Sequence, residues 1–271
     1  MRINQNIMAF NAYRNVSGTN GMLGKSLEKL SSGFRINRAA DDASGLVISQ
    51  ALRAQVSGLR VASRNAQDGI SVVQTAEGAL NEVHSMLNRM RDLSVQAANS
   101  GSNDVTATNA AQAEIDALAS EITRISQQTK FGATTLLDGG FVKQFQIGAN
   151  AGEKLTVSLA TSLNASVLGV VALSVGSAGV ASSAIAAIDV AIATVSATRA
   201  TLGAFQNRFE SVVNNLQVAV ENLAASESRI RDTDMALEMV SFTRHQILMQ
   251  AGTSMLGQAN QSPQTVLRLL H

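Results

Sequence analysis

The sequence has no cysteine and no tryptophan, and it has only one proline and one tyrosine among 271 residues. Without cysteine, disulfide bonds, thiolate metal sites and a cysteine nucleophile are excluded. Aromatic residues make up 3% of the chain, which disfavours a large globular fold with an aromatic core. Proline inside a helix removes a hydrogen bond and clashes with the preceding turn, so its scarcity favours long uninterrupted helices.

Charge is also scarce and balanced. The formal net charge is +1, and the charged residues are interspersed, so the chain has no basic field for nucleic acid or an anionic membrane surface. A hydrophobic content of 45% is too high for a wholly disordered chain. We expect an ordered helical protein with no nucleic-acid partner.

Neither the N-terminus nor the most apolar stretch of the chain has the pattern of a targeting or membrane signal. Polar residues interrupt the first ten residues, where a signal peptide needs a continuous apolar core, so no cleavable secretory signal is expected. The most apolar stretch, residues 165–198, carries Asp189, and a charge there costs about 2.5 to 3.5 kcal/mol at a membrane centre. The sequence therefore predicts no membrane span.

Residues for catalysis or metal binding do not form a known pattern. The only histidines are His84, His245 and His271, and they lack both the HExxH spacing and cysteine partners for zinc. There is no Ser/His/Asp arrangement, phosphate-binding loop or dinucleotide motif. We expect no metal site, no cofactor and no enzymatic activity, and we interpret His84 as a partly buried polar residue of a bundle.

The strongest positive signal is an alternating three- and four-residue spacing of apolar positions, which is typical of coiled-coil-like packing. It predicts long helices over residues 44–99 and 184–230. The C-terminal series is Ile185, Ile188, Ile192, Val195, Leu202, Phe209, Val213, Leu216, Val220, Leu223 and Ile230. The N-terminal series is Leu52, Val56, Leu59, Ala66, Ile70, Val73, Leu80 and Leu87.

The middle of the chain predicts a shorter helix and a small β element. Ile115, Leu118, Ile122 and Ile125 have helical spacing within residues 104–129. Residues 131–140 are expected to form a loop, and alternating apolar residues around the glycines at 148 and 152 predict a β-hairpin over about 141–160. Residues 161–183 are rich in Gly, Ser, Ala and Val and are interpreted as a connector that could include a strand.

Both chain ends predict amphipathic helices with little local core. Such helices are marginal alone, because their stability comes mainly from packing an apolar face on a partner. We therefore expect the two ends to pair with each other or with neighbouring molecules. The contact residues expected at the ends are Ile3, Ile7, Phe10, Leu23, Leu27, Leu30, Val266, Leu267, Leu269 and Leu270.

Several runs closely resemble bacterial flagellin. They are MRINQN at 1–6, LEKLSSGFRIN at 27–37, AADDASGL at 39–46, RMRDLSVQAAN at 89–99, QIGAN at 146–150, SRIRDTDMA at 228–236 and VLRLL at 266–270. The expected fold is mainly α: an elongated coiled-coil-like helical bundle rod with a small β-hairpin, plus an inner domain of paired N- and C-terminal helices.

The resemblance also implies an organisation and a function. Residues 1–43 and 231–271 would form the channel-lining inner domain, and residues 44–230 would form the rod. Many flagellins carry large variable outer domains between these arms, whereas here only a short connector fits. The protein would be exported unfolded by the flagellar type III apparatus and would polymerise into the extracellular filament used for swimming.

Partners are implied by the same resemblance. They are neighbouring flagellin subunits, the export chaperone, the filament cap protein, the hook-filament junction protein and a host innate immune receptor. Arg89, Leu93 and Glu114 match the residues through which many flagellins are recognised by that receptor, on a rod surface that also serves assembly. A charged rod surface buried between subunits is the simpler interpretation of these three residues.

Asp41 and Asp42 are adjacent carboxylates just before the first long apolar series. Catalytic pairs need converging side chains in a pocket, whereas Asp at this position caps free N–H groups at a helix start. The helix N-cap is the favoured interpretation. Three alternatives to flagellin remain: another flagellar axial protein such as a junction protein, a monomeric coiled-coil binding module, and an enzyme carried on an outer domain.

Overall fold

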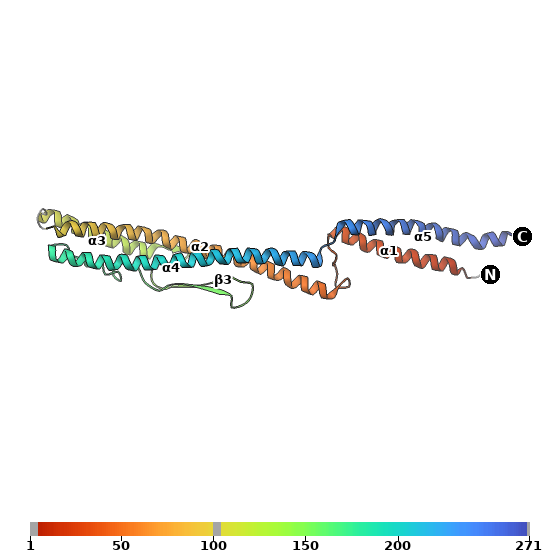
Figure 1. Cartoon of the computed structure of the whole chain (residues 1–271), viewed down its shortest axis with the longest axis horizontal. Coiled ribbons are helices and arrows are strands. Elements are labelled where there is room, and N and C mark those ends of the chain that lie inside the picture. The colour runs from red at the N-terminus through yellow and green to blue at the C-terminus, as the bar shows by residue number, and fades with distance from the viewer. Residues whose placement is uncertain (1–4, 100–103, 270–271) are drawn as a thin grey trace. The chain divides into compact units, whose positions relative to one another are not determined.

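The computed structural model describes residues 5–99 and 104–269, with side chains up to residue 262. Its long helices are α1 (Ile7–Ser32), α2 (Ala43–Ala98), α3 (Val105–Gln128), α4 (Ala178–Arg231) and α5 (Met235–Leu269) (Figure 1). Its strands are β1 (Lys130–Phe131), β2 (Thr134–Thr135), β3 (Phe141–Gln146) and β4 (Lys154–Leu159). The predicted fold class, mainly α with a small hairpin and paired terminal helices, is confirmed.

The chain divides into two compact units. Residues 1–55 and 221–271 form what we call the terminal unit, and residues 56–220 form the central unit. Helices α2 and α3 begin and end within one residue of the ranges that the apolar spacing predicts. Helix α4 begins at Ala178 rather than at residue 184. Its first turns bury the small residues Ala181 and Ala184, whereas the prediction depended on the spacing of large apolar residues.

The central unit is a helical bundle around the predicted apolar stripes. Its fully buried large side chains come from all three helices and include Leu80 and Leu87 of α2, Ile115 and Ile122 of α3, and Ile188 and Leu202 of α4. Ion pairs lie at the bundle surface: Arg91 Nε is 2.8 Å from Asp189 Oδ1, which joins α2 to α4. Hydrophobic burial therefore carries most of the stability of this unit, since exposed ion pairs contribute little.

The β3–β4 hairpin lies on the bundle as predicted. The strands are antiparallel, with Phe141 opposite Leu159, and alternate residues of β4 are buried. The Phe145 ring packs edge to face on Phe209 of α4, with ring centroids 5.4 Å apart. Asn65 Nδ2 of α2 donates a 3.0 Å hydrogen bond to the Gln146 carbonyl, which fixes the end of β3 on the helix.

Two features of the middle segment differ from the sequence interpretation. Residues 131–140, expected to form a loop, contain the short antiparallel pair β1–β2, with Gly132 at φ +59 in its turn. The connector is part of the core: Leu163, Ala165 and Val170 are fully buried. Part of its backbone is bonded by the Gln112 side chain, which donates to the Leu173 carbonyl and accepts from the Val175 N–H, both at 2.8 Å.

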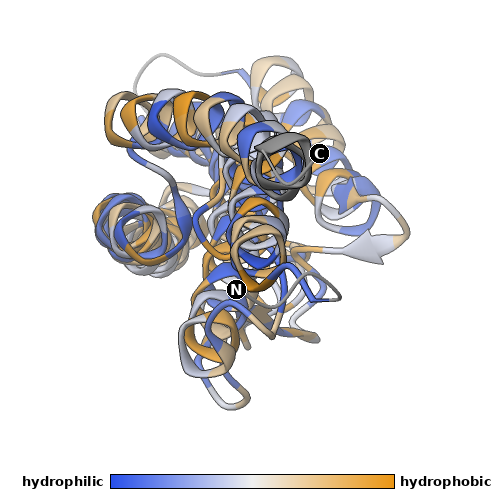
Figure 2. Cartoon of the chain, turned by 90° about the vertical axis from the view of Figure 1, so that its right-hand side faces the viewer, coloured by the Kyte–Doolittle hydropathy of each residue, from blue (hydrophilic) through white to orange (hydrophobic). Residues whose placement is uncertain are grey.

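Helix α4 contains an apolar window long enough, by length and composition, to cross a membrane. The same helix supplies Ile188, Val195, Leu202 and Phe209 to the core of the central unit. Figure 2 shows hydrophobic and hydrophilic residues interspersed along the helices. Bundle packing thus accounts for part of this window, of which 28% is buried.

Candidate assembly surface on the terminal helices

Helices α1 and α5 of the terminal unit lie side by side and run in opposite directions (Figure 1). Asn6 Nδ2, at the start of α1, donates a 2.7 Å hydrogen bond to the carbonyl of Ala259 in the C-terminal part of α5. The backbones approach closely at Gly252, where a Cβ atom would lie 2.8 Å from Val16 Cγ2. The two helices thus pair along most of their length.

The shielded positions of these helices recur every three or four residues, which is the spacing of a coiled-coil seam. On α1 they include Ala9, Ala12, Val16, Thr19, Leu23, Ser26 and Leu30. On α5 they include Phe242, His245, Met249, Gly252, Leu256 and Ala259. We call these residues the terminal seam. Because half of them are small or polar, the seam buries little apolar area and gives α1 and α5 only modest stability.

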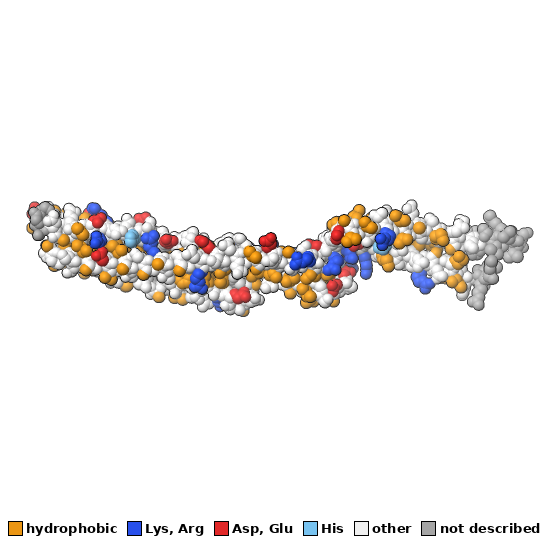
Figure 3. Space-filling view, viewed as in Figure 1, with side chains coloured by type: hydrophobic (Ala, Val, Ile, Leu, Met, Phe, Trp, Pro, Cys, Tyr) orange, Lys and Arg blue, Asp and Glu red, His pale blue; other side chains and the backbone are white. Residues whose placement is uncertain are grey.

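The large apolar residues outside the seam are exposed. Among the expected contact residues, Ile7 is 59%, Phe10 69% and Leu27 57% exposed. On α5 and its start, the exposed large apolar side chains are Met235, Leu237, Met239, Val240, Ile247, Leu248 and Met255. Figure 3 shows hydrophobic side chains gathered on the surface of this helix pair. We call the exposed large apolar side chains of α1 and α5, which also include Met8, Tyr13 and Met22, the outer apolar faces.

The remaining expected contact residues are placed differently. Leu23 and Leu30 belong to the terminal seam and are half-buried. Ile3 and Leu270 lie outside the described residues, as do the side chains of Val266, Leu267 and Leu269. The candidate assembly surface among the described residues therefore includes Ile7, Phe10 and Leu27 of α1 together with the exposed apolar residues of α5.

Two grooves lie on the terminal helices, next to exposed apolar side chains. One, of about 470 Å³, lies along α5 and is lined by Met239, Val240, Ile247 and Leu248, among others. The other, of about 670 Å³, runs between the helices. Its walls include Val16 and Met22 of α1 and Leu248, Gly252 and Met255 of α5. Both grooves are shaped to receive apolar side chains from another molecule.

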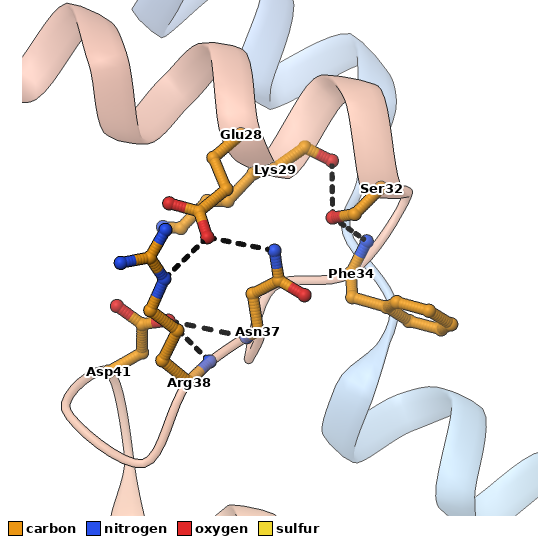
Figure 4. Close-up of polar contacts among 7 residues, drawn as sticks. All are labelled: Glu28, Lys29, Ser32, Phe34, Asn37, Arg38 and Asp41. Atoms are coloured by element: carbon orange, nitrogen blue, oxygen red, sulfur yellow. Dashed lines mark hydrogen bonds and ion pairs between the residues drawn. The ribbon is translucent and has the colours of Figure 1, made fainter.

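A polar network folds the loop between α1 and α2 (Figure 4). Glu28 Oε1 accepts hydrogen bonds from Arg38 Nε at 2.8 Å and from Asn37 Nδ2 at 3.0 Å. Asp41 Oδ2 accepts from the backbone N–H groups of Asn37 and Arg38, at 3.2 and 3.0 Å. We call residues 33–42 the junction loop, and its shape is fixed by these four bonds.

The two adjacent aspartates have different positions in this loop. Asp42 Oδ1 accepts a 2.9 Å hydrogen bond from the Gly45 N–H, three residues into the start of α2, which is the geometry of an N-cap. Gly45 leaves no room for a Cβ beside the Asp42 carboxylate and Ile36 Cδ1. Asp41 bonds backward into the junction loop rather than to α2, so it does not cap the helix.

The junction loop is joined to the end of α4. The Arg35 N–H donates to the Arg231 carbonyl at 2.7 Å, and the Thr233 N–H donates to the Gly33 carbonyl at 2.9 Å. The Arg231 guanidinium lies 4.4 Å from the Phe34 ring centroid, and Arg231 is only 9% exposed. The junction loop and the segment between α4 and α5 are thus joined to each other by backbone hydrogen bonds and a cation–π contact.

Acid is expected to loosen the junction loop. Hydrogen bonds from the Arg38 and Asn37 N–H groups lower the pKa of Asp41, and bonds from the Gly45 N–H and the Ser44 hydroxyl lower the pKa of Asp42, both from an ordinary 3.8. A carboxylate with a lowered folded pKa stabilises the fold above its unfolded pKa and loses that effect as pH falls through the folded value. Amide exchange at Asn37, Arg38 and Gly45, corrected for intrinsic rates, should therefore accelerate below about pH 4.

The matched control for acid loosening is the chain carrying Asp41→Asn and Asp42→Asn, which keeps an acceptor oxygen but cannot titrate. Its amide exchange at the same three positions should change little between pH 5 and pH 3. Equal acceleration in both chains would mean that other groups control the loop.

The residues expected to serve receptor recognition do not form one surface. Arg89 Nε of α2 contacts Glu114 Oε1 of α3 at 2.7 Å, both side chains are exposed, and the bond lowers the pKa of Glu114. Leu93 is only 4% exposed and packs in the core of the central unit. Its inclusion in an exposed surface was wrong, because the α2 stripe that contains Leu87 and Leu93 faces the bundle interior.

Among the described residues, no three His, Asp or Glu side chains are grouped so that they could hold a metal ion. His84 is half-buried on α2, and its Nδ1 has no hydrogen-bond partner in the described part of the chain.

The described residues thus form a mainly helical protein whose paired terminal helices expose large apolar side chains. The family model "Bacterial flagellin N-terminal helical region" matches residues 3–141, and "Bacterial flagellin C-terminal helical region" matches residues 185–270. The chain belongs to the bacterial flagellin family. It is a structural subunit of the flagellar filament.

Individual relatives agree over the whole length. The chain is 51% identical to a flagellin of Halalkalibacterium halodurans and 47% identical to a flagellin of Bacillus subtilis, and in both cases 100% of each chain is covered. The crystal structure of Bacillus cereus flagellin is similar with a TM-score of 0.51 and 30% identity. This similarity covers 60% of this chain and 94% of that one.

Proposed function

We propose that the outer apolar faces of α1 and α5 are the contacts through which these flagellin subunits build the filament. The observation that carries the proposal is the division within each helix: the terminal seam has many small and polar residues, while the large apolar side chains are exposed. A soluble monomer gains nothing from this arrangement, since exposed apolar patches promote association.

The expected gain from burying these faces is large. Full burial of one Val, Leu, Ile, Phe or Met side chain stabilises by about 1.5 to 3 kcal/mol. Ile7, Phe10, Leu237 and Ile247 are each at least 59% exposed, so several such side chains are available per subunit. Contacts between different faces of identical subunits generate an open helical filament when the rotation between subunits does not close a ring.

A charge placed on an outer apolar face tests this proposal. Ile247→Asp would bury an unpaired carboxylate at the contact, costing about 3 kcal/mol or more, which raises the critical concentration for seeded polymerisation at least about a hundredfold. The matched control is Gln246→Asp, the same charge change at the preceding exposed position of α5. Sedimentation of filaments grown from short seeds measures both. Similar critical concentrations for the two variants would contradict the proposal, and a chain that never polymerises would favour a monomeric binding module.

The arrangement of the two units in the filament is also proposed. Residues 1–43 and 231–271 line the central channel, and residues 44–230 form the rod. The separate compactness of residues 1–55 with 221–271 and of residues 56–220 supports this division. The junction loop and the segment between α4 and α5 link these parts along the chain, and the bonds from the loop to Arg231 and Thr233 join the two segments.

Export and partners follow from the terminal helices. We propose that the subunit passes unfolded through the flagellar type III apparatus and folds at the growing, extracellular tip. The terminal seam supports this route, as do Gly18, Gly21 and Gly24 within α1, since each helical glycine costs about 1 kcal/mol relative to alanine. The export chaperone, the cap protein and the hook-filament junction protein would bind the exposed apolar residues of these helices.

A second surface is proposed on the central unit. The Arg89–Glu114 ion pair is exposed and presents charge from two helices, which supports a role in subunit packing and in recognition by a host innate immune receptor. Leu93 is not part of this surface because it is buried. The family is structural, and we propose that the chain has no enzymatic activity.

A further inference from the structure

Methionine is unevenly distributed between the two units. Of nine methionines, only Met86 and Met90 lie in the central unit; Met90 is fully buried, and Met86 is partly buried against the same core. The described methionines of the terminal unit are exposed, except for the half-buried Met249. The exposed fractions are 68% for Met8, 56% for Met22, 48% for Met235, 50% for Met239 and 65% for Met255.

We propose that these five methionines are oxidation sites, and that their oxidation by a peroxide prevents the free subunit from joining a filament. This inference rests on the proposed function, because it assumes that the outer apolar faces are the assembly contacts. In the reaction the thioether sulfur attacks one peroxide oxygen and the O–O bond breaks. An S–O bond forms, water leaves with the second oxygen, and sulfur is oxidised to the sulfoxide as hydrogen peroxide is reduced.

Three of the five methionines line grooves in which a sulfoxide would disturb an apolar contact. Met22 of α1 and Met255 of α5 line the groove between the terminal helices, and Met239 lines the groove along α5. Methionine suits such surfaces because its flexible, polarisable side chain fills irregular gaps. A sulfoxide is polar, so burying it in an apolar groove without a donor partner is unfavourable.

The position of the five methionines also makes their oxidation depend on assembly. In the free subunit their side chains are exposed, and packing of the outer apolar faces in the filament would shield them. The free subunit should thus be oxidised faster than the filament. Met86 and Met90 provide an internal comparison, because their burial within the central unit does not depend on assembly.

The experiment treats free full-length chain and finished filaments with the same dose of hydrogen peroxide, and counts sulfoxides at each methionine by peptide mass spectrometry. Free chain should be oxidised mainly at the five exposed sites, and filaments should be oxidised less at those sites. Oxidised free chain should then show a critical concentration for seeded polymerisation raised about tenfold or more. The control chain carries Met8→Leu, Met22→Leu, Met235→Leu, Met239→Leu and Met255→Leu, which conserve apolar volume.

The control chain is compared with itself: its critical concentration should be the same before and after peroxide treatment, whatever value the five leucines give it. Unchanged polymerisation of wild-type chain whose five sites carry sulfoxides would overturn the inference, and so would equal oxidation of Met90 and Met8 in folded chain. Loss of polymerisation in the peroxide-treated control chain would assign the effect to other residues. If untreated wild-type chain failed to extend seeds, the proposed function itself would fail, which is a distinct result.

Discussion

A chain without residues 1–42 and 232–271 is expected not to lengthen filament seeds at all, whereas the full chain lengthens them. The shortened chain keeps α2, α3, the hairpin, the connector and α4, and therefore the whole core of the central unit. It loses the terminal seam and both outer apolar faces, which supply the largest exposed apolar area for association. Negative-stain electron microscopy of seeds before and after incubation measures the difference.

The shortened chain must be folded for this result to be meaningful. Its circular dichroism should show a strongly helical protein with cooperative thermal unfolding, because the buried positions of the central unit are untouched. Folded, shortened chain that still extended seeds would place the assembly contacts on the central unit. That outcome would leave the outer apolar faces without their proposed role.

The long helices were predictable because their burial follows a simple spacing. In α2 and α4, Leu80, Leu87, Val195 and Leu202 sit on apolar stripes and are all fully buried. A stripe of large residues in a chain almost without proline admits few structures other than a helical bundle. The start of α4 was missed because alanine has high helix propensity but gives little periodic signal.

The connector was harder to predict, since its burial depends on contacts with distant parts of the chain. The Leu163 N–H donates to the Leu137 carbonyl. The Gln112 side chain bonds the backbone at Leu173 and Val175. These bonds satisfy backbone groups of a segment that is partly buried without regular structure, and composition does not record contacts between distant residues.

The assembly surface was predicted only in part. Amphipathic spacing shows that α1 and α5 have apolar residues, but it does not show which of them face each other. Leu23 and Leu30 pack in the seam while Ile7 and Phe10 remain exposed, and this depends on the register of the two helices set by the close contact at Gly252. Likewise, the sequence could not distinguish the N-cap Asp42 from its neighbour.

The second large effect is expected in the core of the central unit. Phe209 is fully buried, packs edge to face on Phe145, and lies over Gly69 of α2. Phe209→Ala should lower the free energy of unfolding by about 3 to 5 kcal/mol, the usual cost of such a cavity. Urea unfolding followed by circular dichroism measures it. Phe205→Ala, four residues earlier on the same helix and only partly buried, is the matched control and should cost clearly less.

Gly69 provides a second test of the same site, because the Phe209 ring determines whether Gly69→Ala lowers or raises the free energy of unfolding. A Cβ at Gly69 would lie 2.6 Å from Phe209 Cζ, so Gly69→Ala should destabilise the wild-type chain by about 1 to 3 kcal/mol despite the higher helix propensity of alanine. Gly78 of the same helix has open space, so Gly78→Ala should stabilise by up to about 1 kcal/mol. In the Phe209→Ala background the clash is gone, and Gly69→Ala should become stabilising. A Gly69→Ala cost that persists in the double variant would show that the ring does not determine the residue at this position.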